Sequence, residues 1–276
     1  MSTTTVDRPQ SSGRASARTA FGALLLRDLA VLRKEIGMFL GRTIMQPLLL
    51  IFVFTYVFPK IGQPIGGVRG ASSFSTLLVG GVIASAMIFQ GVQAVSLPLV
   101  QDFGYTREIE DRVLAPMPVS MVALEKVASG AIQAILAALI VFPLAAIIPA
   151  TKVHLHVHWF LLLTILPLSA VMSAALGLTI GTRVEPRQVP LIFSLLVIPM
   201  TFLGAVYYPW KTLDKLPWLK VAVLVNPLVY MSEGMRAALT VGVPHMAPWA
   251  IYAALIVFTT LFLRTGIAGF KRRVLS

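Results

Sequence analysis

Long apolar runs separated by short polar segments dominate the chain. A helix that crosses a membrane needs about 20 mostly apolar residues. Six runs reach this length, and they cover residues 36–58, 74–99, 127–149, 159–181, 189–208 and 249–268. Because an open sheet edge is not tolerated in hydrocarbon, each run is expected to be helical. The pattern predicts an all-α membrane protein with six transmembrane helices.

The distribution of basic residues orients these six helices. With six crossings, both termini and the 101–126 and 182–188 segments share one side of the membrane. Counting the flanking Arg42 and Arg264, that side holds 16 of the 23 Lys and Arg residues. The cytoplasmic side of a membrane protein carries the excess of basic residues. Both termini are therefore predicted to be cytoplasmic.

A seventh apolar run, 221–241, is broken by Asn226-Pro227 and by the polar stretch 232–236. A seventh crossing would place the basic residues 271–273 outside, against the charge rule. Residues 209–246 are therefore expected to form an extracellular segment that dips into the membrane and returns. Irregular backbone at that depth is tolerated only where it packs against protein.

Composition agrees with a membrane location. Apolar residues make up 57% of the chain and charged residues 12%, with a mean hydropathy of +0.84. Soluble domains carry about 25% charged residues. The absence of Cys excludes a disulfide scaffold, a Cys-ligated zinc site and thiol catalysis. The net charge of +12 is interpreted as basic loops at an anionic cytoplasmic leaflet rather than as a nucleic-acid site.

The N-terminal region divides into two parts before the first span. Residues 1–19 are rich in Ser, Thr and Arg without an apolar core, so they are expected to be a disordered cytoplasmic tail and not a signal peptide. Residues 21–35 have helical periodicity, with Arg27, Arg33 and Lys34 as basic positions and with Asp28 and Glu35 inside an otherwise apolar arc. An amphipathic helix along the inner membrane surface fits this pattern. A water-exposed extension of the first span is the alternative.

A cluster of mixed charges follows the second span. Residues 102–112 contain six charged side chains, and Glu108 and Arg112 stand four apart in a helix-stabilising order. Pro116 and Pro118 then end the predicted helix. A short, rigid helix of this kind suits docking into a groove on a partner protein. An ordinary solvated helix has the same charge pattern, so the pattern alone leaves both interpretations open.

Several polar residues lie within the apolar segments. Arg42 and Gln46 are one turn apart in the first span, and they are candidate pathway residues if Arg42 does not snorkel to the inner surface. Glu233 and Arg236 are three apart and are expected to pair, which lowers the cost of burying both charges. A proton-relay role for Glu233 is the sharper alternative.

Two further patterns have weaker functional interpretations. His154, His156 and His158 alternate in an outer loop, where they are either incidental or metal ligands. The pairs Gly37/Gly41 and Gly177/Gly181 permit close contact between helices and are interpreted as packing positions.

An ordered set of segments resembles the type-2 ATP-binding-cassette (ABC) permeases, a family of drug, lipid and polysaccharide exporters. The matching segments are REIEDRVLAPMPVS (107–120), LEK (124–126), FLGAVYYP (202–209), LPWL (216–219), NPLVY (226–230) and EGMR (233–236). Their order and spacing match across roughly residues 20–270, which defines the transmembrane domain ahead of the basic C-terminus 271–276.

The resemblance implies roles for particular residues. The 102–114 element is similar to the coupling helix, which sits in a cleft of the ATPase subunit. Residues 20–35 are similar to the interfacial connecting helix, and 209–241 to paired re-entrant helices that cap the pathway. The residues implied are Arg107, Glu108, Ile109, Glu110, Asp111 and Arg112 for coupling, Arg27, Arg33 and Lys34 in the interfacial helix, and Asn226, Pro227, Tyr230, Glu233 and Arg236 in the re-entrant gate.

The resemblance also implies partners. It implies two permease chains, identical or different, with two ABC ATPase subunits in the plasma membrane. The sequence contains no GxxxxGK[ST] phosphate loop, so ATP and Mg are expected on a separate ATPase and no cofactor or metal on this chain. The expected function is export of a hydrophobic drug, lipid or glycolipid-like substrate, or of a polysaccharide. One alternative is an ion-coupled secondary transporter, which is disfavoured because the six spans lack a central Asp or Glu. The other is a membrane enzyme, which is disfavoured because no residues converge as a catalytic site.

Overall fold

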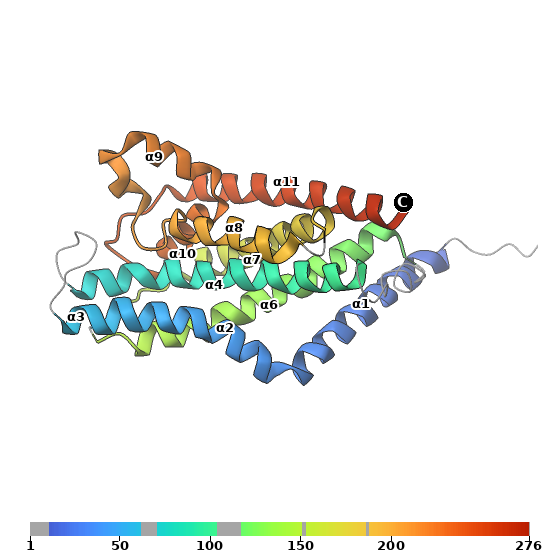
Figure 1. Ribbon diagram of the computed structural model, residues 1–276, viewed down its shortest axis with the longest axis horizontal. Helices are drawn as coiled ribbons and strands as arrows, with labels where there is room; N and C mark the ends of the chain where they lie inside the picture. Colours follow the sequence, from blue (N-terminus) through green and yellow to red (C-terminus); the bar gives the residue numbers. More distant parts are fainter. Residues whose placement is uncertain (1–10, 62–70, 104–116, 151–152, 186–187, 276) are drawn as a thin grey trace, which may run out of the picture.

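The chain folds into one elongated bundle of helices (Figure 1). The computed structural model describes residues 11–61, 71–103, 117–150, 153–185 and 188–275. Across these residues the structure is helical, and the only β pairing is an isolated bridge between Leu155 and Thr240. The predicted all-α fold is confirmed. Five helices are long and apolar enough to cross a membrane, namely Ile36–Val57, Phe74–Gln101, Val119–Ile147, Trp159–Arg183 and Pro248–Val274.

The described elements are α-helices with a few short π- and 3-10-helical pieces. In chain order they are α1 (Ser11–Lys34), α2 (Ile36–Ile51), the π-helical η1 (Phe52–Val57), α3 (Phe58–Lys60), α4 (Ala71–Gln101), α6 (Val119–Ile147), α7 (Trp159–Arg183), α8 (Val189–Phe202), the 3-10 helix η4 (Trp210–Lys215), α9 (Pro217–Ala222), the 3-10 helix η5 (Val223–Val225), α10 (Pro227–Leu239) and α11 (Pro248–Leu275).

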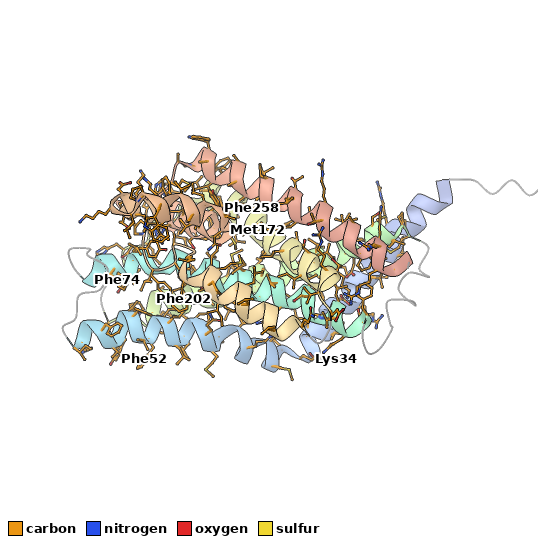
Figure 2. All side chains as sticks on the ribbon, turned by 45° about the horizontal axis from the view of Figure 1, so that its top comes forward. Lys34, Phe52, Phe74, Met172, Phe202 and Phe258 are labelled. Atoms are coloured by element: carbon orange, nitrogen blue, oxygen red, sulfur yellow. The ribbon has the colours of Figure 1, made fainter. Side chains whose placement is uncertain are left out.

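Helix α4 lies at the centre of the bundle and contacts α2, α6, α7, α8 and α10. Side chains fill the space between the long helices, and the labelled Met172 of α7 is completely buried (Figure 2). Small residues bring α4 and α7 together. A Cβ added at Gly177 would lie 2.7 Å from the Val92 carbonyl oxygen, and one at Gly181 would lie 3.0 Å from Ser96 Cα. The predicted packing role of this pair is confirmed. A Cβ at Gly37 or Gly41 would meet no heavy atom within 4 Å, so that pair makes no such contact within the chain.

The two ends of the bundle differ in composition. At one end, here called the basic end, α4, α7 and α11 finish close together and α6 begins (Figure 1). This end carries Lys126, Arg183 and the 271–273 basic run. At the opposite end, the Ala150 N–H donates to the Thr55 carbonyl at 3.1 Å. That bond joins the chain beyond α6 to η1.

The fifth predicted span is shorter than expected. Residues 189–208 were expected to form one helix, but α8 has 14 residues and ends at Phe202. At 1.5 Å per residue it extends about 21 Å, against a hydrocarbon core of about 30 Å. The chain then turns, and Ala205 adopts a left-handed conformation with φ of 52°. The continuous apolar run therefore predicted too long a helix, because hydropathy does not report where the backbone leaves the helical conformation.

The region before the first span is more helical than expected. Helix α1 begins at Ser11, so residues 11–19 are helical rather than part of a disordered tail, while 1–10 lie outside the described residues. Helix α11 continues to Leu275 through the basic run. In Figure 1, α1 approaches the bundle obliquely and meets α2 at a sharp elbow at Glu35.

Candidate functional site

Helix α10 is buried along its whole length, with all 13 residues shielded from solvent. It packs against α4, α7 and α11. Asn226 caps its first turn, because the side-chain Oδ1 accepts the Leu228 N–H at 3.0 Å while Nδ2 donates to the Met200 carbonyl at 2.7 Å. Pro227 occupies the first helical position, where its missing N–H costs no bond. The Tyr230 hydroxyl donates to the Leu224 carbonyl at 3.0 Å.

A buried ion pair lies at the middle of α10. Arg236 Nη1 donates to Glu233 Oε1 at 2.6 Å, and neither side chain is exposed. The same Oε1 accepts the Trp210 N–H at 2.9 Å, and Oε2 accepts the Met246 N–H at 2.6 Å. Three donors therefore satisfy the carboxylate. This arrangement favours a fixed acceptor over a proton relay, since each oxygen is already committed.

Arg236 extends the same cluster to two other segments. Its Nη2 donates to the Ala205 carbonyl at 2.8 Å, and its Nε donates to the Leu77 carbonyl of α4 at 3.4 Å. Two glycines of α4 allow this helix to approach α10 and the turn after α8 closely. A Cβ at Gly80 would lie 2.7 Å from the Arg236 backbone nitrogen, and a Cβ at Gly81 would overlap the Val206 backbone. The ion pair thus joins α10 to α4, to the turn after α8, to η4 and to the segment before α11.

The structure brings the five predicted gate residues together on α10 or at its cap, and the predicted Glu233–Arg236 pair is confirmed. The backbone partners from Leu77, Ala205, Trp210 and Met246 were not predicted. A backbone N–H or carbonyl is present at nearly every residue, so nothing in the sequence identifies those four. The Gly80-Gly81 pair was the signal that could have placed α4 against α10.

A second ion pair connects α1 to α6. Lys126 Nζ lies 2.7 Å from Asp28 Oδ2, with the lysine 4% and the aspartate 15% exposed. This contact explains why an acidic residue interrupts the apolar arc of α1. Leu24, Leu29 and Leu32 are partly buried on the same helix, while Arg33 and Lys34 are exposed. Arg27 is exposed as well, so all three predicted interfacial basic residues are accessible at the surface.

Behind this ion pair lies a cavity of about 560 Å³ between α1, α2, α4 and α6, here called the elbow cavity. Arg27, Arg42 and Lys126 line it together with Gln93 and Gln133. Gln46, the other candidate pathway residue, is absent from its lining. A chain of polar side chains leads from the cavity into the bundle: Thr43 Oγ1 donates to Gln90 Oε1 at 3.2 Å, and Gln90 Nε2 donates to Gln133 Oε1 at 3.4 Å.

The predicted coupling residues Arg107, Glu108, Ile109, Glu110, Asp111 and Arg112 lie outside the described residues. The start of that segment is visible at Phe103. Arg273 of α11 stacks over the Phe103 ring, with Cζ 5.0 Å from the ring centre. Arg273 Nη1 also donates to the Gly181 and Val184 carbonyls at 3.2 and 3.0 Å. Buried Phe270 meets Phe103 edge to face at 5.7 Å, so α4, α7 and α11 converge at this point.

Backbone hydrogen bonds attach the loop with alternating histidines to the end of α10. The N–H groups of His156 and His158 donate to the carbonyls of Leu239 and Ala238 at 3.0 and 2.8 Å. They thereby satisfy carbonyls at the end of α10 that lack helical partners. Within the described ranges no three His, Cys, Asp or Glu side chains gather in a way that could hold a metal ion.

Long apolar helices around a buried helix that carries an ion pair, with a strongly basic end, define a multi-pass membrane protein. The ABC-2 type transporter family model matches residues 19–240, and the chain belongs to that family. The inner membrane transport permease YadH of Escherichia coli K12 is 26% identical over 236 residues, which cover 83% of this chain and 88% of the relative. The protein of the same name from Shigella flexneri is equally similar. The family resemblance and the multi-pass location in the cytoplasmic membrane are confirmed.

Proposed function

We propose that this chain is the membrane subunit of an ATP-driven exporter, paired with a second permease chain and two ABC ATPase subunits. ABC-2 permeases normally work with an ABC ATPase, and this sequence lacks a phosphate-binding loop. The proposed cargo is a hydrophobic drug, lipid or glycolipid-like molecule, with a polysaccharide as the alternative within the family. ATP and Mg would bind the partner ATPase and not this chain.

The proposed topology has six crossings with both termini in the cytoplasm. The fifth of these crossings would combine α8 with the irregular 203–209 segment, since Ala205 meets Arg236 near the start of α4 while α8 begins near the end of α7. The basic end would then face the cytoplasm, as the charge rule requires. On this topology α10 lies at the outer side and serves as a re-entrant gate.

The proposed coupling mechanism rests on one observation, the path of helix α4 through the bundle. This helix of 31 residues extends about 46 Å. Its last residue precedes the segment that leads to 104–116, and its first turns contact Arg236 through the Leu77 carbonyl. A push by the ATPase on the predicted 102–114 coupling element would therefore reach α10 through one packed helix. Coupling through a rigid element of this kind needs no flexible relay.

The test uses the chain with its partner ATPase in proteoliposomes. The Glu108→Ala/Arg112→Ala double variant should keep ATP hydrolysis and lose transport of the substrate. The control is Lys60→Ala, which removes an exposed basic side chain at the opposite end, outside the predicted gate, and should leave transport unchanged. Normal transport by the first variant would contradict the coupling role. Failure of any ABC ATPase to co-purify with the native protein would contradict the proposed class.

A secondary transporter makes the opposite prediction. Transport that persists without an ATPase and collapses with the proton gradient would favour it. The satisfied hydrogen bonds of Glu233 favour the ATP-driven alternative, because an ion-coupled mechanism needs a carboxylate that is free to exchange protons or ions.

A further inference from the structure

The elbow cavity combines charged, amide and apolar walls. Its basic residues are Arg27 on α1, Arg42 on α2 and Lys126 on α6, and its acidic residues are Asp28 and Glu35. Lys126 is already neutralised by Asp28 at 2.7 Å. Arg42 adds a guanidinium to the wall of the cavity that α2 forms.

Arg42 is the unusual member of this set. It lies within the first membrane span, where a charged side chain is costly and normally faces a polar cavity or a partner. Among the described residues, no carboxylate lies within ion-pair distance of its guanidinium. Its side chain instead lines the cavity beside Gln93 and Gln133. A guanidinium in this setting suits a phosphate, which it can bind with two parallel hydrogen bonds.

One edge of the cavity is apolar and uncovered by the rest of the chain. Val31 on α1 and Met38 on α2 line the cavity, and they are 48% and 71% exposed. Figure 1 shows α1 running obliquely to the elbow, where the first candidate span begins. A ligand that fits all walls has a phosphate, hydrogen-bonding groups next to it and an acyl chain.

We propose that the elbow cavity binds the headgroup of a phospholipid from the cytoplasmic leaflet. The phosphate lies against Arg42, and Gln93 and Gln133 contact the glycerol and ester oxygens. Glu35 accepts a hydrogen bond from a hydroxyl or ammonium of the headgroup, and the acyl chain lies along Met38 and Val31. Such a lipid fills the angle between α1 and the bundle, a role separate from the proposed transport of cargo.

The test measures lipid binding to the purified full chain by native mass spectrometry, with no ATPase present. Phosphatidylglycerol should bind the wild type, and Arg42→Gln should weaken that binding about tenfold, the effect of losing one charge-assisted contact. Arg264→Gln is the matched control, because Arg264 is an exposed arginine of α11 outside the cavity. Diacylglycerol, which lacks the phosphate, should bind the wild type as weakly as phosphatidylglycerol binds Arg42→Gln.

Two further arms distinguish a lipid site from a simple phosphate site. Glycerol 3-phosphate, which has no acyl chain, should not displace phosphatidylglycerol; efficient displacement would overturn the lipid assignment. If Arg42→Gln does not yield folded protein, Met38→Trp blocks the apolar wall while Arg42 remains, and it should weaken binding to a similar degree. Equal binding by the wild type and either variant would refute the proposal. These outcomes do not depend on ATP-driven transport, so they are separate from the test of the proposed function.

Discussion

Arg236 and Glu233 stand one helical turn apart on α10 and form an ion pair from which solvent is fully excluded. Breaking such a pair leaves one buried charge without compensation, which costs about 3–5 kcal/mol. Arg236→Met should therefore sharply reduce the yield of folded protein and its thermal midpoint, measured by fluorescence-detected size exclusion after heating.

The exposed pair of Asp214 and Lys220 is the control for this experiment. Asp214 is 69% exposed, and exposed pairs contribute about 0–1 kcal/mol. Asp214→Asn should leave the thermal midpoint almost unchanged. Similar effects of the two substitutions would show that the α10 pair does not hold the surrounding segments together.

The Asp28–Lys126 pair is expected to hold α1 against α6. Asp28→Asn should lower the thermal midpoint and increase protease cleavage of α1, because the nearly buried Lys126 loses its partner. The exchanged variant Asp28→Lys/Lys126→Asp should recover part of the loss. If Asp28→Asn digests like the wild type, the contact does not fix α1.

Arg273 is expected to position the start of the coupling segment. Arg273→Ala removes its stacking on Phe103 and two hydrogen bonds to the end of α7. With the partner ATPase, we expect fewer molecules transported per ATP hydrolysed, because the push on 104–116 is transmitted less completely. Arg272→Ala is the neighbouring control, since Arg272 is exposed. An unchanged transport-to-hydrolysis ratio in Arg273→Ala would exclude this role.

The α4–α7 contact should tolerate no side chain at Gly177. Gly177→Val would drive a side chain into the Val92 backbone, and overpacking costs about 1–3 kcal/mol. The thermal midpoint of the purified chain should fall. Gly41→Val, placed where no heavy atom lies nearby, should not change it. A stable Gly177→Val variant would mean that the two helices separate without penalty.

The sequence predicted features that depend on local pattern, and it missed those that depend on tertiary approach. Periodicity and length located the five long helices, and the spacing of Glu233 and Arg236 predicted their pair. Lys126 gave no such indication, because its partner Asp28 is 98 residues away. The 203–209 turn was missed for a related reason. Its residues are as apolar as a span, and the left-handed conformation of Ala205 shows that the backbone has left the helix.

The short α8 has a consequence for the surrounding bilayer. Leu195, Ile198 and Phe202 are exposed on a helix of 14 residues, which is several ångströms too short for an average hydrocarbon core. Lipid next to α8 must thin locally, or neighbouring protein must cover the polar backbone beyond Phe202. Reconstitution into lipids with longer acyl chains raises the cost of that thinning. The free energy of this protein in the membrane therefore depends on bilayer thickness through one helix, α8.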